Sequence, residues 1–137
     1  MKRRFSSRAL SDAFDIVREV GLALPNVQAA TKYDGSPVLK VGAAFMAGVA
    51  THRSAESATI VVRVDLEERE WLLQEAPDTY YLTNYYRPHP VVLVRLARID
   101  PDALRDLLSV SWRLTLQKAR KPARRSAWVT GSLPMAR

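Results

Sequence analysis

The segment from Glu75 to Leu96 constrains the fold more than any other part of the chain. It holds four of the five tyrosines and three of the eight prolines. A helical pattern leads into it and ends at Pro77, and an apolar, strand-like run from Val91 to Leu96 closes it. Proline lacks a backbone donor, so most of this segment cannot be helix or central strand. We therefore expect a crosspiece that joins a helix to the last strand and packs its rings against the rest of the domain.

Helical signals occur on both sides of this segment and at the start of the chain. Leu10, Phe14 and Val17 begin a helical spacing that Pro25 ends. Asp65 precedes the second pattern as an N-cap with a glutamate at the capping-box position, and Asp100-Pro101 is a strong start for the third. We predict helices over residues 7–24, 65–76 and 100–117.

Apolar runs predict five strands, over residues 29–33, 38–41, 44–50, 58–64 and 91–96. Asp34-Gly35-Ser36-Pro37 is a turn signal between the first two. This order of elements favours an α+β fold, a two-layer sandwich whose antiparallel sheet has helices packed on one face. If the helices cover Ile60 and the residues in step with it, alternation points Arg63, Arg95 and Lys40 to an open second face.

The composition fits one globular domain with unusual ends. The length of 137 residues suits a single domain over 1–117 followed by a basic tail over 118–137. The absence of cysteine and of a long apolar run favours a cytoplasmic protein with no membrane partner. Residues 1–8 carry four basic side chains and residues 117–137 carry six, both without acids, although the net charge of the whole chain is only +7. The ends, more than the middle, suggest a polyanionic partner.

The region around the tyrosines also carries a family resemblance. Residues 62–108 read V-R-V-D-L-E-E-R-E-W-L-L-Q-E-A-P-D-T-Y-Y-L-T-N-Y-Y-R-P-H-P-V-V-L-V-R-L-A-R-I-D-P-D-A-L-R-D-L-L. The motifs A-L-P-N-V and K-V-G-A-A-F-M-A precede this run, and S-W-R-L follows it. Together these motifs resemble the MmcQ/YjbR family over about residues 8–118. The resemblance implies a frataxin-like (CyaY-like) fold and DNA binding through a double-wing arrangement of hairpins.

Nucleic-acid binding is the first functional hypothesis. Lysine and arginine on one surface contact phosphates, and exposed rings stack on unpaired bases. We expect contacts from the loop around residues 51–57, the open sheet face, the segment beside the tyrosines and the basic tail. Tyr85 and Tyr86 are candidates for stacking, with core packing as the competing interpretation. The candidate nucleic-acid-binding residues are Lys40, His52, Arg53, Arg63, Arg87, Arg95, Lys118, Arg120, Lys121, Arg124 and Arg125.

A module that binds a protein partner or a small ligand is the alternative. The middle of the chain is net acidic, and an open sheet face would expose Val38, Val61 and Leu93. An uncovered apolar face often marks self-association or a partner site, so this hypothesis predicts a homodimer or a protein complex through that face.

The remaining residues give little support for metal or catalytic chemistry. Asp12, Asp15 and Glu19 share one side of the first helix and suggest frataxin-like metal handling, but such a stripe more often marks a solvated face. We therefore expect no metal or other cofactor. His52 and His89 each lie apart from any acid or nucleophile in a recognisable spacing, so we do not expect an enzyme.

Overall fold

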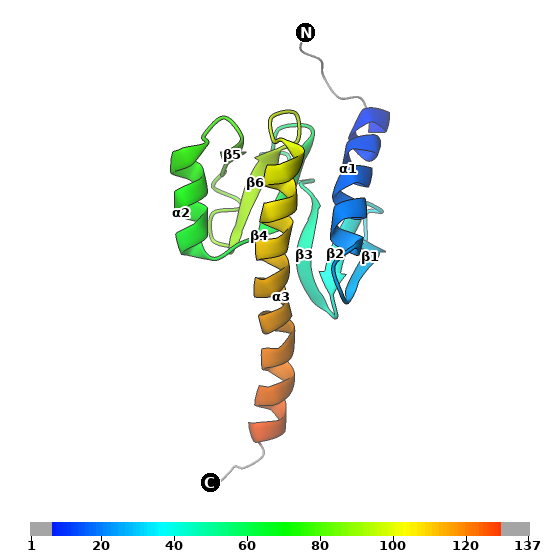
Figure 1. The fold of residues 1–137 in the computed structure, drawn as a ribbon, viewed down its shortest axis with the longest axis vertical. Helices are drawn as coiled ribbons and strands as arrows, with labels where there is room; N and C mark the ends of the chain where they lie inside the picture. Colours follow the sequence, from blue (N-terminus) through cyan, green and yellow to red (C-terminus); the bar gives the residue numbers. More distant parts are fainter. Residues whose placement is uncertain (1–6, 130–137) are drawn as a thin grey trace.

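The computed structural model describes the backbone of residues 7–129 and the side chains of residues 14–119. Figure 1 shows the elements. Their bounds are α1 Ser7–Leu22, β1 Val27–Thr31, β2 Pro37–Val41, β3 Ala44–Val49, β4 Thr59–Arg63, α2 Leu66–Glu75, β5 Tyr80–Tyr81, β6 Val91–Arg95 and α3 Pro101–Val129. The three predicted helices and five predicted strands are present. The two-residue strand β5 was not predicted, because alternation has no meaning over so short a span.

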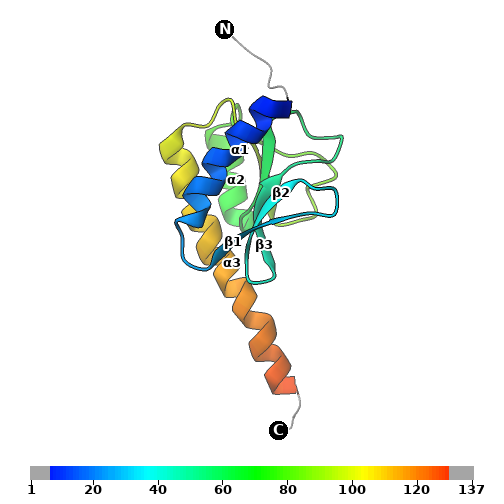
Figure 2. The ribbon, with the colours of Figure 1, turned by 90° about the vertical axis from the view of Figure 1, so that its right-hand side faces the viewer.

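The strands form one sheet in the order β1-β2-β3-β4-β6-β5, and every neighbouring pair is antiparallel. The helices lie together on one face of this sheet, with α3 between α1 and α2 (Figure 1). Seen from the side, helices lie on one side of the strands and loops project on the other (Figure 2). The predicted α+β two-layer sandwich is confirmed.

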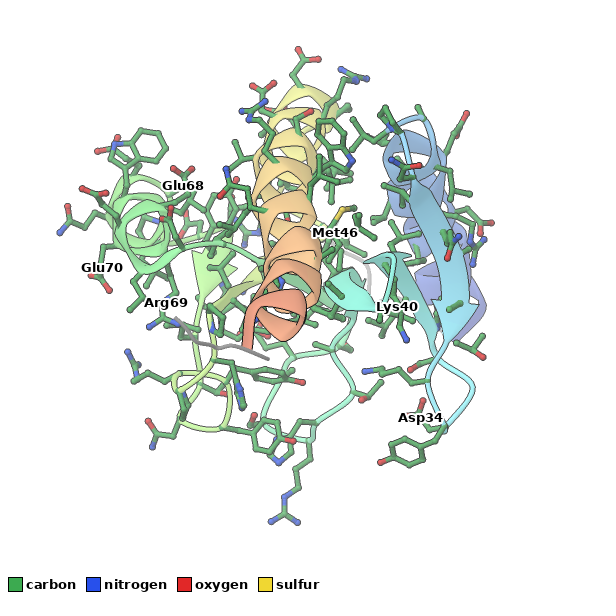
Figure 3. All side chains as sticks on the ribbon, turned by 90° about the horizontal axis from the view of Figure 1, so that it is seen from below. Asp34, Lys40, Met46, Glu68, Arg69 and Glu70 are labelled. Atoms are coloured by element: carbon green, nitrogen blue, oxygen red, sulfur yellow. The ribbon has the colours of Figure 1, made fainter. Side chains whose placement is uncertain are left out.

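The main core lies between the helices and the sheet. Phe14 from α1 and Leu108 from α3 are buried in one apolar cluster with Ile60 and Val94 of the sheet, and Met46 lies between the helices and the strands (Figure 3). Burial of an aliphatic or aromatic side chain of this size contributes about 1.5–3 kcal/mol. The predicted division of the strand residues is also confirmed, because Ile60 and its alternation partners face the helices.

Local signals set the starts of α2 and α3. The Asp65 Oδ1 atom accepts a hydrogen bond from the Glu68 backbone N–H at 2.8 Å, and Asp100 Oδ1 accepts one from the Ala103 N–H at 2.8 Å. Each carboxylate satisfies a donor that the first helical turn leaves unpaired. Both predicted N-caps are therefore confirmed.

Helix α3 is longer than predicted, since it continues to Val129 instead of ending near Gln117. Residues 118–129, called the extension below, have no sustained apolar period and include Pro122, which favoured an irregular tail. The lysines, arginines and alanines around Pro122 are good helix formers, and proline removes only one backbone donor from the helix. Ala119 still packs on the core, and Figures 1 and 2 show the helix beyond it running clear of the sheet and of the other helices.

Candidate functional site

The second face of the sheet is covered by two loops, over residues 50–58 and 82–90, that pack on the strands. Val61 and Leu93 are buried beneath this layer together with Tyr86, and Phe45 packs beside them. Figure 3 shows the loops on the opposite side of the strands from the helices. The expectation of an open apolar face was therefore wrong, since Val38, Val61 and Leu93 are at most 6% exposed. Alternation along a strand identifies a face, but it carries no information about where a loop will lie.

Tyrosine hydroxyls tie the two loops to each other and to the sheet. The Tyr81 hydroxyl accepts a hydrogen bond from the Glu56 N–H at 2.7 Å and shares a second, of 2.8 Å, with the Thr59 hydroxyl. The Tyr86 hydroxyl accepts from the His52 N–H at 3.2 Å. Burial raises the pKa of Tyr86. The tyrosine segment thus acts as the expected crosspiece, and Tyr81 and Tyr86 serve mainly in packing.

Arg95 lies on this covered face, as predicted, but its guanidinium is fully engaged. It forms two 2.8 Å hydrogen bonds with the carboxylate of Glu56 and donates to the carbonyls of Pro77 and Asp78. The same group lies 4.2 Å from the centre of the Tyr81 ring. The hydrogen bonds between the two side chains lower the pKa of Glu56 and raise the pKa of Arg95. Arg95 therefore fastens the loop over 50–58 and is poorly suited to hold a phosphate.

His52 stacks on the exposed ring of Tyr85. The two ring centroids are 3.5 Å apart and the planes differ by 9°. The His52 Nδ1 atom accepts the Ser54 N–H at 3.1 Å and also contacts the Ser54 hydroxyl, which in turn bonds Thr83 at 2.8 Å. His52 covers one face of the Tyr85 ring, and these contacts hold the pair in place at the junction of the two loops.

Arg63 lines a pocket of about 280 Å³ next to this stacked pair. Phe45, Tyr85, Tyr86 and His89 supply its ring-bearing walls. The Arg63 Nε donates to the Phe45 carbonyl at 2.7 Å, and within residues 14–119 no carboxylate forms an ion pair with Arg63. Burial lowers the pKa of this guanidinium, although an arginine remains charged. The pocket therefore presents a partly buried positive charge that an incoming anion would neutralise.

Arg69 supports one wall of the pocket from behind, a role that sequence reasoning missed. Its Nη1 atom donates to the carbonyls of Arg87, His89 and Val91 at 3.3, 2.8 and 3.2 Å. Figure 3 shows Arg69 leaving α2 toward this loop, whereas Glu70 points away. The available signal was an arginine on the inner stripe of the helix, three residues before Leu72.

The other predicted binding residues fall into two groups. Half-buried Lys40 lies opposite Phe45 in the β2–β3 register, and exposed Arg53 and Arg87 follow His52 and Tyr86 in the chain. Of the predicted binding residues whose side chains are described, only Arg63 lines the pocket, and His52 stacks on Tyr85 of its wall. Lys118 is exposed on α3, and the next residue, Ala119, lies beside the turn at Gly42. Four predicted residues of the extension have side chains outside the described part of the structure: Arg120, Lys121, Arg124 and Arg125.

The acidic stripe of α1 gives no support to a metal site. Asp15 pairs with Arg18 at 2.6 Å, and the side chain of Asp12 lies outside the described residues. Among the side chains described, no group of three or more histidine or acidic residues is placed to hold a metal ion. The helices in the described part of the chain include none that is both long and apolar enough to cross a membrane.

Comparisons with known proteins place the chain in a family. The YjbR family model matches residues 22–114, which include the sheet, both covering loops and the pocket. A crystal structure of a Deinococcus radiodurans protein with a DUF419 domain is 27% identical, covers 82% of this chain and 85% of that one, and has a TM-score of 0.62. No curated protein matches the chain. The resemblance carried by residues 62–108 and the motifs around them is thus confirmed at the level of the family: the chain belongs to the YjbR family.

Proposed function

We propose that this protein binds DNA through the loop-covered face of its sheet, without catalysing a reaction on it. The observation that carries the proposal is Arg63, a partly buried cation that has no carboxylate partner among the described residues and lies in a pocket walled by rings. A guanidinium presents a planar array of donors that suits phosphate oxygens. A pocket that combines such a group with tyrosine and histidine rings fits a nucleotide better than it fits an aliphatic anion.

The exposed ring at the mouth of the pocket favours an unpaired base. Tyr85 is 53% exposed, and His52 occupies only one of its faces. Stacking of a base on an aromatic side chain contributes about 1–3 kcal/mol and requires that the base has left its own stack. We therefore expect single-stranded or locally opened DNA to bind more tightly than an intact duplex.

The basic residues around the pocket supply the part of the affinity that does not depend on sequence. Lys40 is paired with Phe45 of the pocket wall in the sheet register, Arg53 and Arg87 follow His52 and Tyr86 in the chain, and the extension adds further basic residues. Each phosphate contact releases condensed counterions, so the affinity should fall steeply as salt rises.

The contacts of His52 favour binding over catalysis. Its Nδ1 atom accepts the backbone N–H of Ser54, and its ring face is packed on Tyr85. Both contacts fix the position of one loop relative to the other, which is the role expected of a structural histidine.

Fluorescence anisotropy with labelled single-stranded and duplex oligonucleotides over a salt series tests the proposal. Arg63→Gln should weaken binding to both forms and reduce the salt slope by about one. Tyr85→Ala should weaken single-strand binding by about 1–3 kcal/mol, with a smaller effect on the duplex. Tyr33→Ala is the matched control, because Tyr33 is fully exposed at the β1–β2 turn and does not line the pocket.

Two results would overturn the proposal. One is the absence of binding to either oligonucleotide at low salt. The other is binding that Arg63→Gln and Tyr85→Ala leave unchanged, which would assign the affinity to another surface, such as the extension.

A further inference from the structure

A second concave surface lies on the helix layer, between α2 and the first half of α3. It is a groove of about 290 Å³ with an apolar floor that includes Leu72, Leu107 and Val110. Trp71 stands at its wall and is 56% exposed, which is high for so large an apolar side chain. Exposed tryptophan beside an apolar groove is typical of a protein-binding surface.

The rim of this groove is acidic. Glu68, Glu75 and Asp106 line it, and none of the three forms an ion pair among the described side chains. Figure 3 shows Glu68 on the side of α2 that faces α3. The negative field reaches the floor, because Asp100 and Glu68 add to burial in raising the pKa of Tyr80. The surface therefore suits an apolar segment flanked by positive charges.

The extension of α3 has that composition. Lys118, Arg120, Lys121, Arg124 and Arg125 fall within it together with the apolar Trp128, and no acid occurs after Asp106. Helices in proteins gain most of their stability from tertiary packing, and Pro122 removes one backbone hydrogen bond from the extension. A helical extension that stands clear of its own domain is thus expected to need a partner surface (Figure 2).

The groove cannot be filled by the basic residues of its own extension. One wall of the groove and the extension are parts of the same continuous helix, α3. Because a helix rises about 1.5 Å per residue, Arg124 lies about 27 Å from Asp106 along the helix axis. A second copy meets no such restriction. If two α3 helices lie antiparallel about their common middle at Thr115, the level of Asp106 in one matches the level of Arg124 in the other. Because the pair is two-fold symmetric, the extension of each copy then lies level with the groove of the other.

We infer that the protein forms a reciprocal dimer, in which the basic extension of each copy occupies the acidic α2–α3 groove of the other. This surface is separate from the loop-covered face, so the inference does not rest on DNA binding. Because its charges are exposed, the dimer should weaken as salt rises.

A charge-swap experiment on the full chain tests the inference. Glu75→Lys with Asp106→Lys reverses two exposed residues of the groove, and Arg124→Glu with Arg125→Glu reverses the extension. At low salt, light scattering should show the wild type at twice the chain mass of 15.4 kDa and each reversed protein as a monomer, with affinity lowered about tenfold or more. An equimolar mixture of the two reversed proteins should again be dimeric, because each reversed extension then meets a reversed groove.

Glu70→Lys with Glu67→Lys is the control, because it changes the charge of the chain by the same amount at two exposed residues of α2 that do not line the groove, and it should leave the dimer intact. A monomeric wild type at low salt would refute the inference. So would a dimer that survives both reversals, since another surface would then hold the copies together. If the reversed proteins stay monomeric when mixed, although their circular dichroism shows that they are folded, the extension is not the occupant of the groove.

Discussion

Removal of the Arg69 guanidinium should destabilise the protein, although sequence reasoning gave this residue no role. Arg69 is 7% exposed, and within the described residues its charge is balanced by backbone carbonyls in place of a carboxylate. Arg69→Met keeps the length of the side chain but leaves those carbonyls without their donor. The loop over residues 87–91, which forms part of the pocket wall, then loses its connection to α2.

The expected magnitude follows from the contacts. Nη1 carries two hydrogens, so it satisfies about two of the three carbonyls at a time. A hydrogen bond from a charged donor contributes about 1.5–3 kcal/mol. Water can replace the donor at the exposed residues Arg87 and His89, but less easily at the buried Val91. The buried Nε of Arg69 has no hydrogen-bond partner among the described residues, so removing it offsets about 1 kcal/mol of this loss. We expect a net loss of about 2 kcal/mol for Arg69→Met and about 3 kcal/mol for Arg69→Ala, which also loses the packed stem.

Urea unfolding at neutral pH, followed by circular dichroism, measures these differences. Glu70→Gln is the matched control, since Glu70 is the exposed neighbour on the same helix, and it should change the free energy of unfolding by less than about 0.5 kcal/mol. Amide hydrogen exchange over residues 86–91 should also accelerate in Arg69→Met. If Arg69→Met costs no more than Glu70→Gln, the carbonyl contacts do not hold the loop.

Three further predictions concern single contacts. Glu56→Gln should lower the free energy of unfolding at pH 7 by only about 0.5–1 kcal/mol, because the Glu56 carboxylate and its partner Arg95 are both partly exposed. The pKa of Glu56 is lowered in the folded protein, so the contribution of the ion pair to stability is lost as the pH falls below the ordinary value of 4.5. If urea unfolding shows the same destabilisation by Glu56→Gln at pH 3 as at pH 7, the ion pair is not its cause. Burial raises the pKa of Tyr80 and Tyr86 above 10.0, so absorbance at 295 nm should show a component that titrates above that pH and shrinks in Tyr80→Phe, and stability should fall as the pH rises past 10. Asp65→Ala should cost about 1 kcal/mol in thermal unfolding whereas Asp65→Ser costs little, and equal losses would argue against the N-cap.

Most of the local structure could be predicted from the sequence, because its causes are local. Asp65 and Asp100 cap helices through atoms three residues away, and Pro25 and Pro77 end helical patterns by their own geometry. Period-two alternation assigned Arg63 and Arg95 to the correct face, since neighbouring side chains on a strand point to opposite sides.

The character of the site could not be predicted in the same way. Arg95 was a candidate phosphate ligand until its partner Glu56, 39 residues away in the chain, proved to accept hydrogen bonds from both its Nε and its Nη2 atoms. Arg63 lies on the same face and has no such partner in the described structure, yet nothing in the sequence around the two arginines distinguishes them. Whether an arginine is paired within the protein or left available for a ligand depends on residues that are distant in sequence.

The tyrosine segment shows the same division. Its composition alone determined that it would be a rigid, ring-rich connection between a helix and the last strand, because proline and aromatic residues restrict the backbone and demand burial. Only the tertiary structure decided that it folds back over the sheet, buries Tyr86, leaves Tyr85 exposed against His52 and closes a pocket around Arg63. The path of a loop depends on which distant surfaces it can cover, and that information is spread over the whole chain.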